Sequence, residues 1–198
     1  MHPFPLQPGD ALIVVDVQND FLPGGALAVA AGAEVIPPLN QYIEEFERQH
    51  LPVFATRDWH PSNHCSFTEQ GGPWPSHCVT GTYGAQFPRQ LRLPADVRII
   101  SKATQAEADA YSGFQGTDLA QELCDMGCRR VFIGGLATEY CVRATVLDAR
   151  AAGFAAVVLA DAVRALDAHP GDGERALGEM RASGAEILRV GEPSRAQQ

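Results

Sequence analysis

A cysteine that could act as a nucleophile stands at position 141, in the segment GGLATEYCV. Paired glycines precede it, and Thr138 could cap a helix that carries the cysteine, which would place the thiol near the positive end of the helix dipole. Such a position favours the thiolate, and neighbouring backbone N–H groups could receive an oxyanion, as acyl transfer requires. An isolated cysteine is more often a small packing residue, so Cys141 needs partners before it indicates catalysis.

Two charged residues could be those partners, because Asp16 follows one apolar run and Lys102 follows another. A carboxylate at the end of a buried strand needs a cationic or proton-bearing partner, and Lys102 can serve as one. The pair could instead be a structural salt bridge with no catalytic role. Beside Cys141, the carboxylate could remove the thiol proton and the ammonium could stabilise the thiolate. The three residues together therefore predict an acyl-transfer site.

A candidate metal site lies in RDWHPSNHCSF and the later WPSHC. Asp58 and His60 alternate along an extended segment, so their side chains project to one side, and His77 could return on the loop. One carboxylate with imidazoles suits Zn, Fe or Mn. Three further side chains of the same stretch could contribute: His64, Cys65 and Cys78. The spacing matches no zinc finger or HExxH signature, so loop histidines bonded to backbone groups remain an alternative.

The elements that must position these residues alternate between strands and helices. Apolar runs predict six strands, at residues 11–17, 52–56, 97–100, 130–134, 155–160 and 185–190. Helical patterns mark residues 33–49, 117–126, 138–152 and 173–183. This alternation predicts an α/β fold, with a doubly wound six-stranded parallel sheet and helices on both faces. The carboxyl ends of such strands share one crevice, so the polar residues that follow them can converge.

The length of 198 residues fits one domain, with an ordered core of about residues 8–190. Residues 58–96 show no convincing period and carry three of the six histidines, so this long irregular segment is expected to be functional. The C-terminal segment GEPSRAQQ is expected to be flexible. Cys124 and Cys128, four residues apart on a predicted helix, are expected to pack.

The composition disfavours several partners. A net charge of −9, without clusters of Lys and Arg, predicts no binding of nucleic acid. No apolar run approaches the roughly 20 residues of a membrane helix, so no membrane partner is expected. Five cysteines and an N-terminus unlike a secretory signal predict free thiols and a cytoplasmic location. The absence of GxGxxG and P-loop patterns argues against a nucleotide cofactor, and a homo-oligomer is possible.

The chain resembles the isochorismatase-like cysteine hydrolases from ALIVVDVQNDF to AEILRV, which is nearly its whole length. The resemblance implies a catalytic triad of Asp16 in DVQNDF, Lys102 in SKAT and Cys141 in GLATEYCV. It also implies a cis peptide bond between Leu136 and Ala137, with the Ala137 and Cys141 amides as oxyanion donors. Glu139 stands where Asp is common in the family, a departure that leaves the triad intact.

Within that family, DWHP with a following WPSHC is similar to nicotinamidases. This resemblance implies one divalent metal ion, Zn before Fe or Mn, bound by Asp58, His60 and His77 with His64 near or on it. It also implies that three aromatic side chains enclose a pyridine ring: Phe21, Trp74 and Tyr111. The implied reaction is hydrolysis of nicotinamide to nicotinate and ammonia through a cysteine thioester, as a step of NAD salvage.

Three other functions are compatible with parts of the pattern. The chain could be another amidase of the superfamily, such as a ureidoacrylate or carbamoyl-compound hydrolase. It could also be a silent binding protein, or a hydrolase of enol ethers that uses no thiol. The presence of all three triad residues argues against the last two, and a bound metal would distinguish a nicotinamidase from the first.

Overall fold

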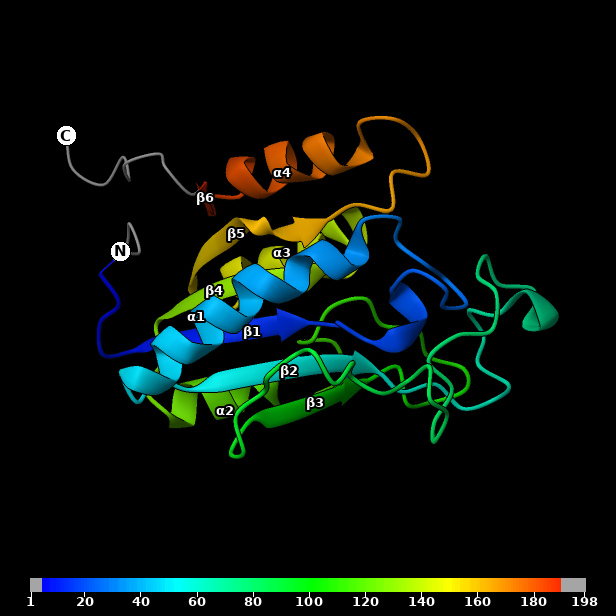
Figure 1. The fold of residues 1–198 in the computed structure, drawn as a ribbon, viewed down its shortest axis with the longest axis horizontal. Coiled ribbons are helices and arrows are strands. Elements are labelled where there is room, and N and C mark those ends of the chain that lie inside the picture. The colour runs from blue at the N-terminus through cyan, green and yellow to red at the C-terminus, as the bar shows by residue number, and fades with distance from the viewer. Residues whose placement is uncertain (1–4, 190–198) are drawn as a thin grey trace.

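The computed structural model describes residues 5–189, and its centre is a six-stranded parallel sheet (Figure 1). The strands in chain order are β1 (Asp10–Val15), β2 (Val53–Asp58), β3 (Arg98–Lys102), β4 (Arg130–Leu136), β5 (Ala155–Arg164) and β6 (Glu186–Leu188). Their order across the sheet is β3-β2-β1-β4-β5-β6, and every neighbouring pair is parallel. The predicted sheet is confirmed. Val190 and the GEPSRAQQ segment lie outside the described residues.

The sheet is buried on both sides, which explains the continuous apolar runs that predicted it. All six residues of β1 are buried, and side chains alternate between two separate hydrophobic clusters. Leu12 and Val14 pack on one face, whereas Ala11, Ile13 and Val15 pack on the other. Burial of both faces requires helices above and below the sheet.

Four α-helices provide this cover: α1 (Ile36–Arg48), α2 (Leu119–Asp125), α3 (Arg143–Ala151) and α4 (Asp172–Ala182). Helix α1 packs in the cluster of Leu12 and Val14, and it crosses in front of the sheet in Figure 1. The other three helices pack in the second cluster, on the opposite face. The doubly wound architecture is therefore confirmed, and none of the described helices is long and apolar enough to cross a membrane.

Two predicted helices begin differently from the expectation. The helix expected over residues 33–49 starts as a 3-10 turn, Gly32–Val35, and becomes α1 only at Ile36. Two prolines follow Ile36, and proline fits only the first turn of an α-helix because it has no N–H. The helix expected over residues 138–152 starts as a π-helical turn, Thr138–Val142, before α3.

The expected capping role of Thr138 is wrong. Ala137 occupies the position before the π-helical turn, and no side chain there caps it. Thr138 is itself the first residue of the turn, so it does not occupy the capping position. Cys141 still lies where the π-helical turn passes into α3, at the N-terminal end of that helix.

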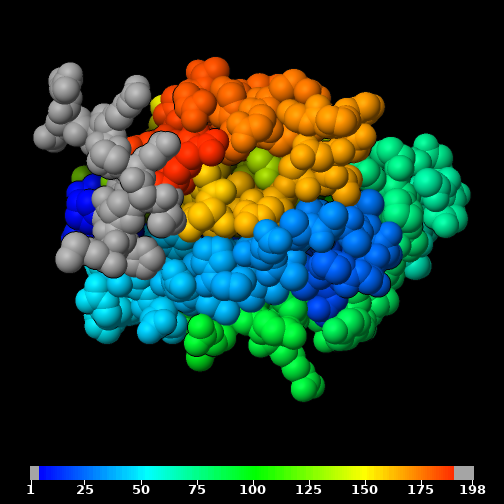
Figure 2. All heavy atoms as spheres, turned by 45° about the horizontal axis from the view of Figure 1, so that its top comes forward, coloured from blue at the N-terminus to red at the C-terminus, as the bar shows by residue number. Residues whose placement is uncertain are grey.

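The long segment between β2 and β3 is irregular, as expected. Its only described helical turn is Thr68–Gln70, and isolated bridges join His60 to Val79 and Phe67 to Trp74. Figure 2 shows much of this segment, in teal, projecting at one end of the molecule beside the blue residues that follow β1. The strand arrows point toward this end in Figure 1, so the segment covers the carboxyl edge of the sheet.

Candidate active site and metal centre

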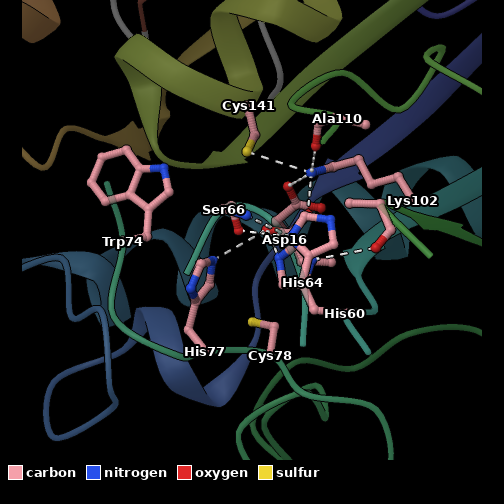
Figure 3. Close-up of polar contacts among 12 residues, drawn as sticks. Asp16, His60, His64, Ser66, Trp74, His77, Cys78, Lys102, Ala110 and Cys141 are labelled. Atoms are coloured by element: carbon pink, nitrogen blue, oxygen red, sulfur yellow. Dashed lines mark hydrogen bonds and ion pairs between the residues drawn. The ribbon is translucent and has the colours of Figure 1, made fainter. Parts of the chain in front are cut away.

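The candidate site lies where the direction of winding reverses, between β1 and β4. One chain crossover leads from β1 toward β2 and the other leads from β4 toward β5, which leaves a crevice at their carboxyl ends. Asp16 directly follows β1, Asp58 and Lys102 end β2 and β3, and Cys141 follows β4. The structure brings these four side chains together (Figure 3).

Lys102 lies at the centre of the group and is fully buried. Its Nζ is 3.0 Å from Asp16 Oδ2 and 3.6 Å from Cys141 Sγ, and it donates to Ala110 O at 3.1 Å and to Asp58 Oδ1. Burial alone would lower the pKa of Lys102, but the two carboxylates outweigh burial and raise this pKa well above its usual value. The side chain is therefore a permanent ammonium.

Asp16 is held rigidly beside this ammonium. Its Oδ1 accepts a 2.6 Å hydrogen bond from Thr56 Oγ1, and its backbone adopts a positive φ of 49°, where the chain turns out of β1. Although Oδ2 is 3.0 Å from Lys102 Nζ, it has no well-directed hydrogen bond within the described residues. Burial raises the pKa of Asp16 against the opposing effect of Lys102. A buried carboxylate with one free acceptor is suited to take a proton.

Cys141 is only 6% exposed, and burial raises the pKa of its thiol well above the usual value. Lys102 acts in the opposite direction, but the charges of Asp16 and Asp58 add to the effect of burial. The thiol form of Cys141 is therefore favoured, although its position near the start of a helix was expected to favour the thiolate. One ligand atom each of Cys141, Asp16 and Asp58 lie within 4.8 Å of one another, so a carboxylate oxygen is close to the thiol.

A second group of ligand atoms converges beside the first and consists of Asp58, His60 and His77. Asp58 Oδ2 is 3.6 Å from His60 Nε2 and 3.9 Å from His77 Nε2. His60 Nδ1 lies 3.3 Å from Ala103 O, and His77 Nδ1 lies 2.7 Å from Pro75 O. A backbone carbonyl can only accept, so each Nδ1 carries a proton, and in the neutral imidazole this tautomer leaves the lone pair on Nε2.

This group fits a divalent metal ion. His60 Nε2 is buried and has no hydrogen-bond partner within residues 5–189, although an orphaned buried nitrogen is costly. Burial also lowers the pKa of His77, which favours the neutral imidazole that metal binding requires. Burial alone would raise the pKa of Asp58, but the ammonium of Lys102 opposes burial and this pKa lies below its usual value, so the carboxylate is ionised. Two neutral imidazoles and one carboxylate form a donor set for a transition metal.

His64 and the two neighbouring cysteines are placed differently. The ring of His64 lies tilted against that of His60, with 4.2 Å between the ring centroids and 36° between the ring planes. Its Nδ1 lies 2.8 Å from Ser66 Oγ and its Nε2 lies 3.2 Å from Ala108 O. As a ligand it would have to exchange one of these bonds for the metal, so that role stays a prediction. Neither Cys65 nor Cys78 belongs to the converging group among the described residues.

An apolar chamber adjoins both groups, and all three predicted aromatic residues line it. Phe21, Trp74 and Tyr111 share its wall with Cys141, His77 and Ala137. Trp74 Nε1 donates to Tyr111 Oη at 2.9 Å, which locks the two rings together. In Figure 3, Trp74 and His77 lie on the side of Cys141 away from Lys102. The chamber thus lies between the candidate metal ligands and the thiol.

Several residues of the site were not identified from the sequence. Tyr140 also lines the chamber, with its ring 5.1 Å from that of Trp74 and 6.0 Å from that of Tyr111. Gln18 is fully buried and bonds to the backbone of Asp58, and Thr56 orients Asp16. The signal for Gln18 was present, because a polar residue directly after a buried strand needs hydrogen-bond partners.

The expected cis peptide bond is present between Leu136 and Ala137. It lies at the end of β4, and Ala137 and Cys141 both line the chamber. Their role as oxyanion donors, which the family resemblance implied, stays a prediction.

The fold, with a buried thiol, two carboxylates and an ammonium gathered at the carboxyl edge of its sheet, is that of an α/β hydrolase with a candidate cysteine nucleophile. The isochorismatase domain family matches residues 10–192, and the chain belongs to this family. The nicotinamidase of Acinetobacter baylyi is 41% identical over 200 residues, which cover 90% of this chain and 91% of that one.

Solved structures agree with that assignment. A pyrazinamidase of Pyrococcus horikoshii in complex with zinc superposes with a TM-score of 0.89 at 55% identity, covering 92% of this chain and 100% of the other. A protein of L. infantum in complex with nicotinate superposes with a TM-score of 0.84 at 37% identity, covering 92% and 93%. The family resemblance and the fold inferred from the sequence are confirmed.

Proposed function

We propose that this protein hydrolyses nicotinamide to nicotinate and ammonia through an acyl-enzyme on Cys141. The observation that carries the proposal is one chamber in which aromatic walls, two metal-ligand residues and the thiol meet. The similarity to nicotinamidases along nine-tenths of the chain supports the same substrate. A pyridine carboxamide has a flat ring for the aromatic walls and a carboxamide carbon for the sulfur.

The three buried residues have complementary roles in the proposed reaction. Asp16 takes the thiol proton as the sulfur of Cys141 attacks the carboxamide carbon, and Asp16 then gives that proton to the nitrogen that leaves as ammonia. The raised pKa of the Cys141 thiol disfavours a free thiolate, so Asp16 is proposed to remove the proton as the sulfur attacks. Lys102 Nζ, 3.6 Å from the sulfur, stabilises the negative charge as it develops.

The second half of the reaction releases the product. Water attacks the thioester, its proton passes to Asp16, and the carbon–sulfur bond breaks to yield nicotinate and the thiol. The backbone amides of Ala137 and Cys141 are proposed to hold the oxyanion in both halves. Phe21, Trp74 and Tyr111 are proposed to enclose the pyridine ring and to exclude bulk water.

Zinc is the proposed metal, because two neutral imidazoles and one carboxylate leave a coordination position open, as in catalytic zinc sites. Asp58, His60 and His77 would hold it, with His64 packed against His60 as a further candidate ligand. When bound, the ion would supply a Lewis acid for the pyridine nitrogen and thereby fix the ring in the chamber.

The biological setting follows from the reaction. We propose that the nicotinate produced from nicotinamide enters NAD salvage. The cysteines of the described residues are free thiols, which is typical of a reducing compartment, so a cytoplasmic location is proposed. No nucleotide cofactor takes part in the proposed reaction. Assembly into a homo-oligomer stays a prediction, which light scattering on the purified protein would test.

An ammonia-release assay with purified, zinc-loaded protein tests the proposed substrate. We expect turnover of nicotinamide, and of pyrazinamide if ring size alone sets the fit of the chamber. Ureidoacrylate and N-carbamoyl compounds have no pyridine nitrogen and should release ammonia at least about 100-fold more slowly, because positioning by the metal is lost. Faster turnover of a carbamoyl compound would replace this proposal with another amidase activity of the same family.

A further inference from the structure

Three consecutive side chains after β1 reach across to the two segments that carry the metal ligands. Residues 18–20, QND, follow Val17 and lie between the end of β2 and residues 78–86 of the long irregular segment. None of the three is among the residues that converge as metal ligands. Their hydrogen bonds nevertheless end on the backbone beside two of those ligands.

Gln18 pairs with both backbone groups of Asp58. Its Nε2 donates to Asp58 O at 2.8 Å, and its Oε1 accepts from Asp58 N at 2.8 Å. The same Nε2 donates to Ala85 O at 3.0 Å, in the segment that follows His77. The side chain is fully buried, so it continues the β1–β2 hydrogen bonding past the point where β1 has ended.

Asp20 holds the other segment next to His77. Its Oδ2 accepts from Cys78 N at 2.7 Å, and its own N–H donates to Gly84 O at 3.0 Å. Asn19 adds a backbone bond from its N–H to Gln86 O at 2.9 Å. Residues 18–20 therefore bond to the backbone of the segment that carries His77 as well as to the backbone of Asp58.

The backbone at Gly84 lies directly against the carboxylate of Asp20. A Cβ at position 84 would lie 2.0 Å from Asp20 Oδ2, far inside any real contact distance. The carboxylate could move away only by giving up its bonds to Cys78 N and, at 3.3 Å, to Ala26 N. Glycine at this position lets the backbone of the irregular segment rest directly on Asp20.

We propose that Gln18 and Asp20 are positioning residues that set the separation between Asp58 and His77 before any metal arrives. Asp58 and His77 are then already close to the positions that they take when zinc is bound. Zinc binding therefore needs little rearrangement of the protein, and the zinc affinity is high. Groups that orient metal ligands from outside the coordination shell commonly change metal affinity by about 10–100-fold. The inference rests on the metal site of the proposed function.

The test compares Gln18→Met with a matched variant, Asn40→Leu. Asn40 is also buried and also bonds to backbone at both ends of its amide, with Nδ2 donating to Gln90 O and Oδ1 accepting from Arg92 N, each at 2.8 Å. Both variants replace a buried amide with an apolar side chain of similar size, and both leave backbone groups unpaired. Gln18 bonds to the metal-ligand residue Asp58 itself, whereas Asn40 bonds to residues of the irregular segment well past His77.

The measurement is the dissociation constant for zinc, obtained by titrating chelator-stripped protein against a chromophoric zinc indicator. We expect Q18M to bind zinc about 10–100-fold more weakly than wild type, whereas N40L stays within about 2-fold despite a similar loss of thermal stability. Saturating zinc should restore most of the ammonia release of Q18M. Equal affinity in Q18M and wild type, or an equal loss in N40L, would overturn the inference.

Two further results separate this inference from the function on which it rests. If wild-type protein binds no zinc, the metal site itself is wrong and the positioning role falls with it. If Q18M does not fold, Gly84→Ala gives an independent test, because it displaces Asp20 without touching Gln18. G84A should also weaken zinc binding, and wild-type affinity in a folded G84A would count against the role of Asp20.

Discussion

The ammonium of Lys102 has four electron-rich neighbours of three kinds: two carboxylates, one carbonyl and one thiol sulfur surround a single buried nitrogen. Asp16 and Asp58 would repel each other in this desolvated place without it. The candidate group of Asp16, Asp58 and Cys141 could formally hold a metal, but Lys102 already places a cation among these side chains. Its charge therefore serves both the stability of the fold and the proposed chemistry.

Replacing Lys102 with Met should lower both stability and activity. Breaking a buried ion pair by removing one partner costs about 3–5 kcal/mol, because the remaining charges stay desolvated. Urea unfolding should show this loss, and ammonia release should fall by at least about 1000-fold. The control is Arg98→Met, which removes the surface pair with Glu122 at 3.0 Å and should cost less than about 1 kcal/mol. Similar losses in the two variants would contradict the central role of Lys102.

At the scale of elements, the site depends on how closely β4 approaches β1. Gly135 in β4 pairs with Val15 at the end of β1, and its φ is +133°. A Cβ at this position would lie 2.0 Å from Val15 O. This close approach brings the turn that carries Cys141 next to Asp16, which directly follows Val15.

Replacing Gly135 with Ala should therefore destabilise the fold by about 3 kcal/mol or more, since the side chain needs both a disfavoured φ and space occupied by backbone. Gly178→Ala is the matched control, because Gly178 lies on the exposed side of α4 and no atom lies within 4 Å of its added Cβ. Alanine there should leave stability unchanged or raise it by about 0.5–1 kcal/mol. Urea unfolding of both variants makes the comparison, and a mild effect of G135A would show that β4 can move away from β1.

The elements themselves were largely predictable from the sequence, because burial on both faces of a parallel sheet produces unmistakable apolar runs. What periodicity could not show is how the helices begin. The two prolines after Ile36 fit the first turn of α1, and the pattern over residues 138–142 gives no sign of the π-helical turn that precedes α3. The hydrogen bonds of Gln18 were equally hidden, since they join residues 40 and 67 positions apart.

In the molecule as a whole, the candidate metal ligands come from two structurally different parts of the chain. Asp58 ends a strand of the sheet, whereas His77 belongs to a segment with almost no regular structure. A ligand that binds only the folded protein stabilises it by mass action, by about 4 kcal/mol at 1000 times the dissociation constant. Zinc should therefore stabilise the entire fold.

Thermal unfolding with zinc and with a chelator measures this linkage. For a chain of this length we expect the midpoint to fall on the order of 10 °C when zinc is removed. A protein with both His60 and His77 replaced by Ala should unfold at the same temperature under both conditions. A chelator effect that persists in the double variant would mean that zinc binds elsewhere.

The candidate site could be predicted to a similar extent as the fold, for a physical reason. Asp16, Asp58, Lys102 and Cys141 follow strands that lie side by side, so strand order alone was enough to bring them together. The raised pKa of the Cys141 thiol was not predictable, because it depends on burial and on the charge of Asp58 nearby. That Tyr140 lines the chamber was not predictable either, because this follows from the contacts of its ring with those of Trp74 and Tyr111.

Replacing Cys141 with Ala tests whether the reaction proceeds through this sulfur. We expect the zinc-loaded variant to bind nicotinamide, measured by calorimetry, because the aromatic walls and metal ligands are intact. Its ammonia release should fall to the background rate, since no other described thiol lines the chamber. Ammonia release by C141A at a rate near that of wild type would contradict an acyl-enzyme on Cys141, because the reaction would then not proceed through this sulfur.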